Sequence, residues 1–91
     1  MVKNKEKNQE YAKWREDSIV EYAYLVNHIA SRFAMRLPSS VFFDELVSAG
    51  SLGLIDAVDK FDPSKHVSLK TYAQYRIKGA ILDELRSMDT Y

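Results

Sequence analysis

Residues 69–86 combine aromatic rings, cations and a glycine in one predicted helix. At about 100° per residue, one arc gathers residues suited to a core: Leu69, Ala73, Ile77 and Ala80. The opposite arc holds Thr71, Tyr72, Tyr75, Lys78, Gly79, Leu82 and Arg86. Rings that stack on exposed bases, beside cations that hold the neighbouring phosphates, are typical of a surface that binds single-stranded nucleic acid.

The same arc has a second interpretation that needs no nucleic acid. Tyr72 and Tyr75 would close the edge of a small core, and the cations would form an ordinary solvated surface. The helix alone does not decide between the two interpretations.

Residues for catalysis or metal binding do not form a recognisable pattern. Gly50-Ser51-Leu52-Gly53 lacks the lysine and the preceding strand of a phosphate-binding loop. His28 and His66 have no carboxylate nearby at metal-ligand spacing, and adjacent acids such as Asp83 and Glu84 diverge by about 100° on a helix. The sequence therefore predicts a protein that is not an enzyme and that needs no metal or other cofactor.

Length and composition favour one domain from a reducing compartment. The chain has 91 residues and no cysteine, and its longest uncharged runs, among them 46–55, are too short to span a bilayer. The basic, polar start is unlike a secretory signal, so we expect a cytoplasmic protein in which residues 1–10 form a flexible lead-in.

Charge is unevenly distributed although the formal net charge is zero. Residues 16–59 include seven acidic residues but only two basic ones, Arg32 and Arg36. Residues 60–86 include six basic residues and three acidic ones. An acidic middle beside a basic end suggests two surfaces with different partners.

Hydrophobic periodicity predicts an all-α fold, a compact bundle of three to five helices. Apolar residues recur at helical spacing from about Tyr11 to Met35, and Pro38 ends that helix. Ser39 or Ser40 would cap a second helix, which Gly50 and Gly53 would interrupt or bend.

The second helix is predicted to end near Phe61. A turn at 62–65 follows, and Ser68 would cap the last helix. No segment alternates as a strand does.

The stretch from Phe43 to Asp62 resembles region 2 of bacterial sigma factors of the sigma-70 family, and the resemblance continues from Leu69 to Arg86. Arg36-Leu37-Pro38 and residues 76–89 are similar to the flagellar and motility sigma factors, with the sporulation sigma factors next. Residues 11–91 would then be a region 2 domain with an N-terminal helix like region 1.2, and the later sigma domains would be absent.

The resemblance implies a fragment of a promoter-recognition subunit of bacterial RNA polymerase. In the family, one surface of this domain docks on the clamp helices of the polymerase β′ subunit, and another captures the non-template single strand of the melted −10 promoter element. The docking positions correspond to Asp44, Glu45, Ser48, Ala49, Ser51, Leu54 and Ile55. The DNA-binding positions correspond to Lys70, Thr71, Tyr72, Tyr75, Arg76, Lys78 and Arg86.

This chain departs from the family at two places. Tyr75-Arg76 stands where housekeeping members have a tryptophan pair, and Ser48-Ala49 stands where members have acidic and amide residues. The alternative is an all-α protein-interaction module without a direct DNA role, whose binding would respond little to salt. An anti-sigma protein also binds members of the flagellar group, so binding to a protein alone would not separate the two.

Overall fold

The computed structural model describes residues 2–38 and 42–88, with side chains from residue 8 onward. Three α-helices, α1 (Val2–Ala34), α2 (Phe43–Lys60) and α3 (Leu69–Ser87), form the fold, with a short 3₁₀ helix η1 (Pro63–Lys65) before α3. The described residues contain no strand. The predicted all-α bundle is therefore confirmed.

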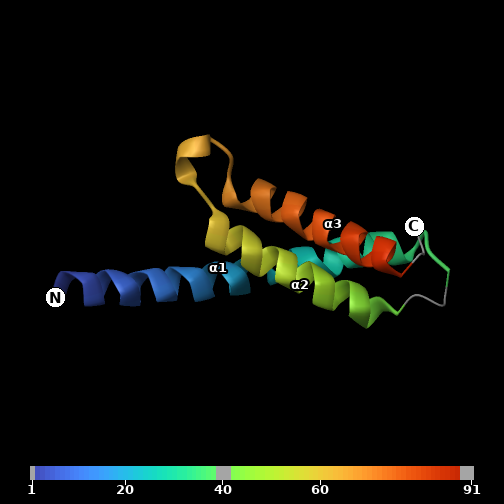
Figure 1. Ribbon diagram of the computed structural model, residues 1–91, viewed down its shortest axis with the longest axis horizontal. Helices are drawn as coiled ribbons and strands as arrows, with labels where there is room; N and C mark the ends of the chain where they lie inside the picture. Colours follow the sequence, from blue (N-terminus) through green and yellow to red (C-terminus); the bar gives the residue numbers. More distant parts are fainter. Residues whose placement is uncertain (1, 39–41, 89–91) are drawn as a thin grey trace.

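Helix α1 is longer than the other two helices and extends past them. It runs antiparallel to α2, while α3 runs in the same direction as α1, and the N-terminal half of α1 continues beyond the end of the bundle (Figure 1). The helix includes residues 2–10, where we expected a lead-in before a helix starting near Tyr11. No proline or glycine interrupts this segment, and its lysine, glutamate and glutamine residues favour helix.

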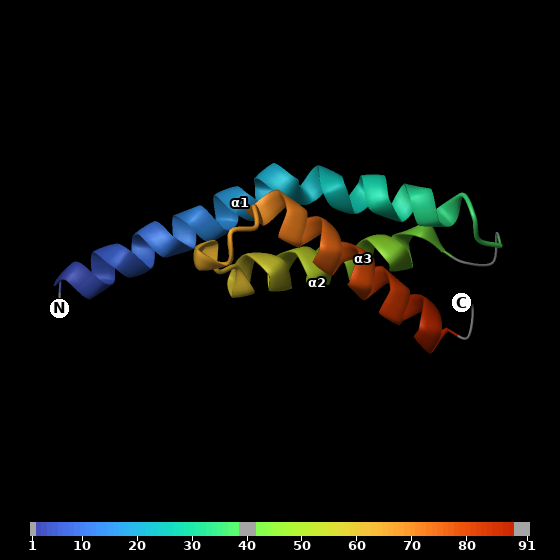
Figure 2. The same cartoon turned by 90° about the horizontal axis from the view of Figure 1, so that it is seen from above.

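The core lies where the three helices meet. Its largest fully buried side chains are Leu46 and Val58 of α2 and Ile77, Ile81 and Leu85 of α3. Helices α2 and α3 pack extensively against each other. Helix α1 packs on one side of this pair through Leu25, Val26 and Ala30 (Figure 2). Burying these apolar side chains provides the main drive for folding.

The buried stripe of α3 differs from the predicted one in its C-terminal half. It consists of Ala73, Ile77, Ile81 and Leu85, whereas Leu69 and Ala80 are only partly buried. The four buried residues are each four positions apart, and each step of four advances about 40° around the helix. The buried stripe therefore turns slowly along α3 and passes through Ile81 instead of Ala80.

Helix α2 is continuous through Gly50 and Gly53, so the prediction of an interruption was wrong. Both glycines are buried and serve close packing between helices. A Cβ on Gly53 would lie 2.7 Å from the carbonyl oxygen of Arg76, and one on Gly50 would lie 3.0 Å from Cγ1 of Val26. Helix α1 can approach α2 closely at Gly50, and α3 can do so at Gly53, because neither glycine has a side chain.

Helix ends follow local capping chemistry. The hydroxyl of Ser68 accepts a hydrogen bond from the backbone N–H of Thr71 at 3.1 Å, as the sequence predicted. Asp62 accepts one from the N–H of Ser64 at 3.0 Å at the start of η1, which confirms the turn. Ser39 and Ser40 lie outside the described residues, and Phe42 stands at the N-cap of α2 without a side-chain hydrogen bond.

Candidate functional site

The outer face of α3 consists of Tyr75, Lys78, Gly79, Leu82 and Arg86, on the side opposite the buried stripe. Tyr75 is 72% exposed, far more than a ring that closes a core. Its apolar surface is therefore available to a ligand. Tyr72 behaves differently, because it is half-buried and packs against the core. Tyr72 therefore fits the interpretation in which a ring closes the core, and Tyr75 fits the interpretation in which a ring is available to a ligand.

Gly79 leaves the outer face hollowed. A Cβ built on it would meet no atom within 4 Å. A hollow of about 500 Å³ extends along this face and is lined by Tyr75, Arg76, Lys78, Gly79, Ala80, Leu82, Asp83 and Arg86. No packing requirement within the described fold explains a glycine at this position. A flat group such as a base can approach the α3 backbone closely there.

Arg76, which we expected to contact DNA, is engaged inside the fold. Its guanidinium donates to the carboxylate of Asp56 on α2, and its buried Nε has no acceptor among the described residues. On the helix Arg76 lies about 100° from Tyr75, toward α2. The structure therefore gives Arg76 a role in joining α3 to α2, and its predicted contact with DNA stays a prediction.

The remaining DNA-binding candidates lie at the surface. Lys70, Thr71, Lys78 and Arg86 are exposed. The Thr71 hydroxyl accepts from Ser68 at 3.0 Å, and Arg86 pairs with Asp83 at 3.0 Å. An exposed pair such as Arg86–Asp83 contributes little energy, so Arg86 can exchange this partner for a phosphate.

The exposed face of α2 consists of Asp44, Glu45, Ser48 and Leu52. Leu52 is 69% exposed, a large aliphatic side chain between acidic and small polar neighbours. The sequence comparison with the family missed Leu52. Its angle on the helix, about 40° from Ser48, would have placed it on this face.

Leu54 was assigned to the docking surface, and the structure corrects this assignment. It is 2% exposed and belongs to the core, so it cannot contact a partner directly. Ala49, Ser51 and Ile55 are half-buried. They flank the exposed face and remain accessible to a partner helix.

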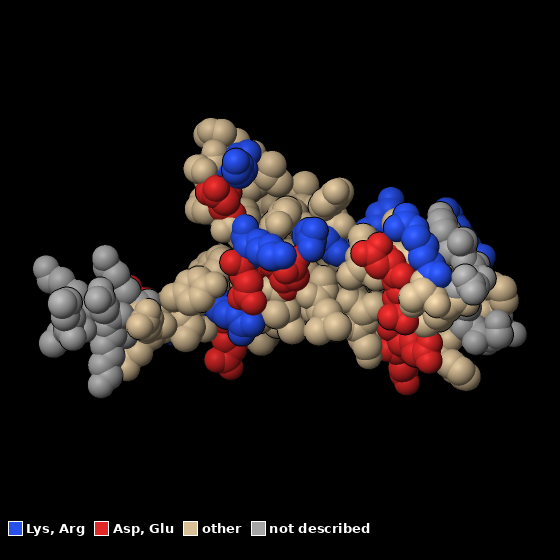
Figure 3. Space-filling view, viewed as in Figure 1, with Lys and Arg blue, Asp and Glu red and all other residues tan. Residues whose placement is uncertain are grey.

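The two faces differ in charge. In Figure 3, Lys and Arg side chains lie over the C-terminal part of α3, next to a band of Asp and Glu that extends toward the start of α2. The first turn of α2 contributes the acids Asp44 and Glu45, and the exposed face of α2 has no cation. The outer face of α3 has Lys78 and Arg86 beside Asp83. A basic partner would therefore be attracted more to the exposed face of α2 than to α3.

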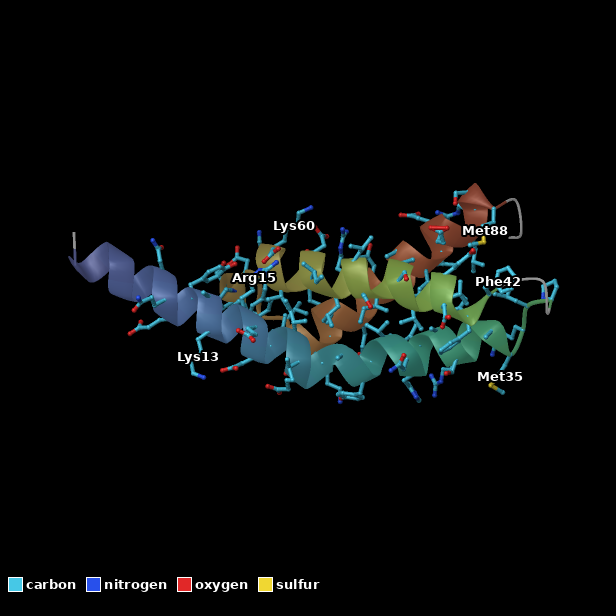
Figure 4. All side chains as sticks on the ribbon, turned by 90° about the horizontal axis from the view of Figure 1, so that it is seen from below. Lys13, Arg15, Met35, Phe42, Lys60 and Met88 are labelled. Atoms are coloured by element: carbon cyan, nitrogen blue, oxygen red, sulfur yellow. The ribbon has the colours of Figure 1, made fainter. Side chains whose placement is uncertain are left out.

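Ion pairs at the far end of α2 neutralise the acids there. Lys60, at 3.0 Å, and Arg76 hold the pKa of Asp56 below its ordinary value. A hydrogen bond from Arg15 of α1 likewise lowers the pKa of Asp59. Figure 4 shows Arg15 directed toward the C-terminal end of α2, near Lys60, whereas Lys13 points away from the bundle. These acids brace the helices and are not part of the exposed face of α2.

None of the three helices in the described part of the chain is long and apolar enough to cross a membrane. No group of three or more histidine, aspartate or glutamate side chains within 2–38 and 42–88 is arranged to hold a metal ion.

The family model Sigma-70 region 2 matches residues 19–90. The chain therefore belongs to the sigma-70 region 2 family.

Relatives narrow the group within this family. The chain is 52% identical over 68 residues to RNA polymerase sigma factor FliA of Salmonella typhimurium. The aligned residues cover 75% of this chain and 28% of that protein. It is 42% identical over 87 residues to RNA polymerase sigma-D factor of Bacillus subtilis, covering 87% and 34%. The chain thus spans about a third of the length of these relatives.

A solved structure has the same fold. It is the cocrystal structure of the flagellar sigma/anti-sigma complex, Sigma-28/FlgM, with a TM-score of 0.78 and 39% identity, covering 89% of this chain and 36% of that one. The similarity to the flagellar and motility sigma factors, first suggested by residues 76–89, is confirmed by these comparisons.

Proposed function

We propose that this chain is the part of a flagellar-type sigma factor that binds promoter DNA and core RNA polymerase during transcription initiation. The outer face of α3 captures the non-template single strand of the −10 element. The exposed face of α2 docks on the clamp helices of the β′ subunit. The observation that carries the proposal is the exposed Tyr75 beside the hollow over Gly79, with Lys78 and Arg86 at its edges.

Strand capture follows from the chemistry of that face. Stacking of a base on an aromatic side chain contributes about 1–3 kcal/mol. Unstacking one base step costs a few kcal/mol, so a few stacking and phosphate contacts offset the opening of a short A·T-rich segment. The domain needs no nucleotide fuel, because it traps bases that have already left the duplex. Its zero net charge gives little long-range attraction, so binding without polymerase is expected to be weak.

Docking of polymerase is supported by the composition of the exposed face of α2. Leu52 supplies an apolar centre, Asp44 and Glu45 supply charge for a basic partner, and Ser48 is small enough for a helix to approach closely. An anti-sigma protein is a further proposed partner, because the related solved structure is a sigma/anti-sigma complex.

Strand capture is tested by anisotropy of a labelled −10 non-template oligonucleotide. We expect Tyr75→Ala to weaken binding by roughly 5- to 150-fold, the equivalent of one stacking contact. Tyr24→Ala is the matched control, since Tyr24 is 54% exposed but lies on α1. Equal binding by Tyr75→Ala and Tyr24→Ala would refute capture by α3 and favour the protein-interaction module.

Docking is tested by calorimetry with an isolated β′ clamp-helix fragment. We expect Glu45→Lys to abolish binding. Leu52→Ala should weaken it by roughly 10- to 60-fold, because it removes three carbon groups that contribute up to about 0.8 kcal/mol each when buried. Val20→Ala is the control for Leu52, since Val20 is 70% exposed on α1. Binding that both α2 variants leave unchanged would contradict the proposed docking face.

A further inference from the structure

Helix α1 carries two large aromatic rings on the part that extends past the bundle. Ser18 and Leu25 are buried within the bundle, and Tyr11 and Trp14 continue the same stripe toward the N-terminus. All four residues lie within an arc of about 60° around the helix. Tyr11 is 49% exposed and Trp14 is 38% exposed. The stripe therefore continues beyond the bundle, where the described residues leave both rings partly uncovered.

The turns of α1 before Arg15 have no other described helix beside them. Arg15 attaches α1 to the C-terminal end of α2, with its Nη2 3.1 Å from Oδ2 of Asp59. Before this residue α1 projects from the bundle in both views (Figure 1, Figure 2). Tyr11 and Trp14 lie against each other there, with ring centroids 5.8 Å apart. We call these two residues the projecting rings. Exposed aromatic side chains of this kind are typical of a surface that binds another protein.

The order of charge along the projecting part favours a second copy of the same helix. Residues 2–9 include three lysines and one glutamate, whereas residues 16–23 include three acids and no base. The projecting rings lie between these two segments. If two copies of α1 pack antiparallel about a point midway between Tyr11 and Trp14, residues 2–9 of one copy lie beside residues 16–23 of the other. Opposite charges then meet at both ends of the contact, whereas a parallel pair would place like charges together.

The positions of the rings fit the same arrangement. In that register Tyr11 of each copy lies opposite Trp14 of the other copy. The steps from Tyr11 to Trp14 and from Trp14 to Ser18 are three and four residues, the spacing of side chains along the seam of a coiled coil. Both copies use the same surface, as a two-fold contact requires.

We infer that the projecting rings form a self-association surface, on which a second copy of this chain packs its α1 antiparallel. An unrelated helix would need to reproduce this order of charge, whereas a second copy already carries it. The contact leaves the outer face of α3 and the exposed face of α2 free. The inference is therefore independent of the proposed function, and its test uses neither DNA nor polymerase.

Sedimentation equilibrium of the chain measures the association. The contact is confined to a few turns of helix and is smaller than the roughly 800 Å² per partner of stable complexes, so we expect dimers only toward the upper end of a series from about 10 µM to 1 mM. Tyr11→Ala and Trp14→Ala should each raise the dissociation constant of the dimer by roughly 5- to 150-fold, because each dimer loses two aromatic contacts.

Tyr24→Ala is the matched control, since Tyr24 is also an exposed tyrosine of α1 but lies about 140° from Tyr11 around the helix. It should associate as the parent does. Circular dichroism at the lowest concentration checks that all three variants keep the helix content of the parent.

Salt tests the antiparallel arrangement. Raising the salt concentration should weaken the dimer, because it screens the attraction between the basic and acidic segments. A dimer that becomes tighter with salt would contradict this arrangement. A parent chain that is monomeric at every concentration would overturn the inference and would leave the projecting rings to a different protein. A dimer that Tyr11→Ala and Trp14→Ala weaken no more than Tyr24→Ala does would place the contact elsewhere and would also overturn it.

Discussion

Gly53 and Gly79 lie on two helices of the same small domain and do opposite things. Gly53 is where α2 meets the backbone of α3, with no space for a methyl group. Gly79 is on the outer face of α3, where a methyl group would touch nothing. The distance between α2 and α3 therefore depends on the missing side chain at Gly53, whereas no part of the described fold covers Gly79. The first region is built for folding, and the second is available for a ligand.

Among the substitutions that test this comparison, Gly53→Ala should reduce the stability of the fold the most. The added Cβ would lie 2.7 Å from the Arg76 carbonyl oxygen and 2.9 Å from the Cβ of Ala80, so the helices must move apart. Overpacking of this kind costs roughly 1–3 kcal/mol. Urea unfolding followed by circular dichroism measures the change. An unaltered midpoint would mean that α2 and α3 do not pack as closely as described.

These glycines show what the sequence could and could not predict. Helical periodicity and the caps predicted the three helices and most of their ends, since they depend on local spacing. Whether a glycine meets another helix depends on which helices are neighbours, so Gly53 and Gly79 look alike in the sequence. For the same reason Leu54, at a matching family position, was assigned to the surface, and the pairing of Arg76 with Asp56 was not foreseen.

The Asp56–Arg76 pair belongs to the packed region, and its removal should cost less. We expect Asp56→Asn, which breaks the pairs with both Arg76 and Lys60, to reduce stability at pH 7 by about 1 kcal/mol, the upper end for partly exposed pairs. Because the pKa of Asp56 is lowered in the folded state, its stabilisation is present above the ordinary pKa near 3.8 and is lost as the pH falls through the folded value.

Urea unfolding of parent and Asp56→Asn at pH 7 and near pH 3 measures this dependence. The two proteins should differ at pH 7 and converge in acid. Asp17→Asn is the control, since Asp17 pairs with Lys13 at an exposed site. A difference between parent and Asp56→Asn that persists unchanged at low pH would show that the pair is not the source of the stability.

Gly79→Ala should stabilise the protein slightly, by up to about 1 kcal/mol, because alanine favours helix over glycine and meets no steric obstacle. Its methyl group would also occupy part of the hollow over α3. We therefore expect weaker binding of the −10 oligonucleotide together with a higher unfolding midpoint. A variant that binds the strand as tightly as the parent would argue against a close approach of DNA to Gly79.

The central claim is that α3 and α2 present two independent faces to two different partners. It is tested most directly by titrating the labelled −10 oligonucleotide into the chain with and without saturating β′ clamp-helix fragment. The account predicts that both ligands bind at once, so the strand affinity is the same or higher when the fragment is present. Displacement of the strand by the fragment would show that the two partners share one face, and would contradict the account.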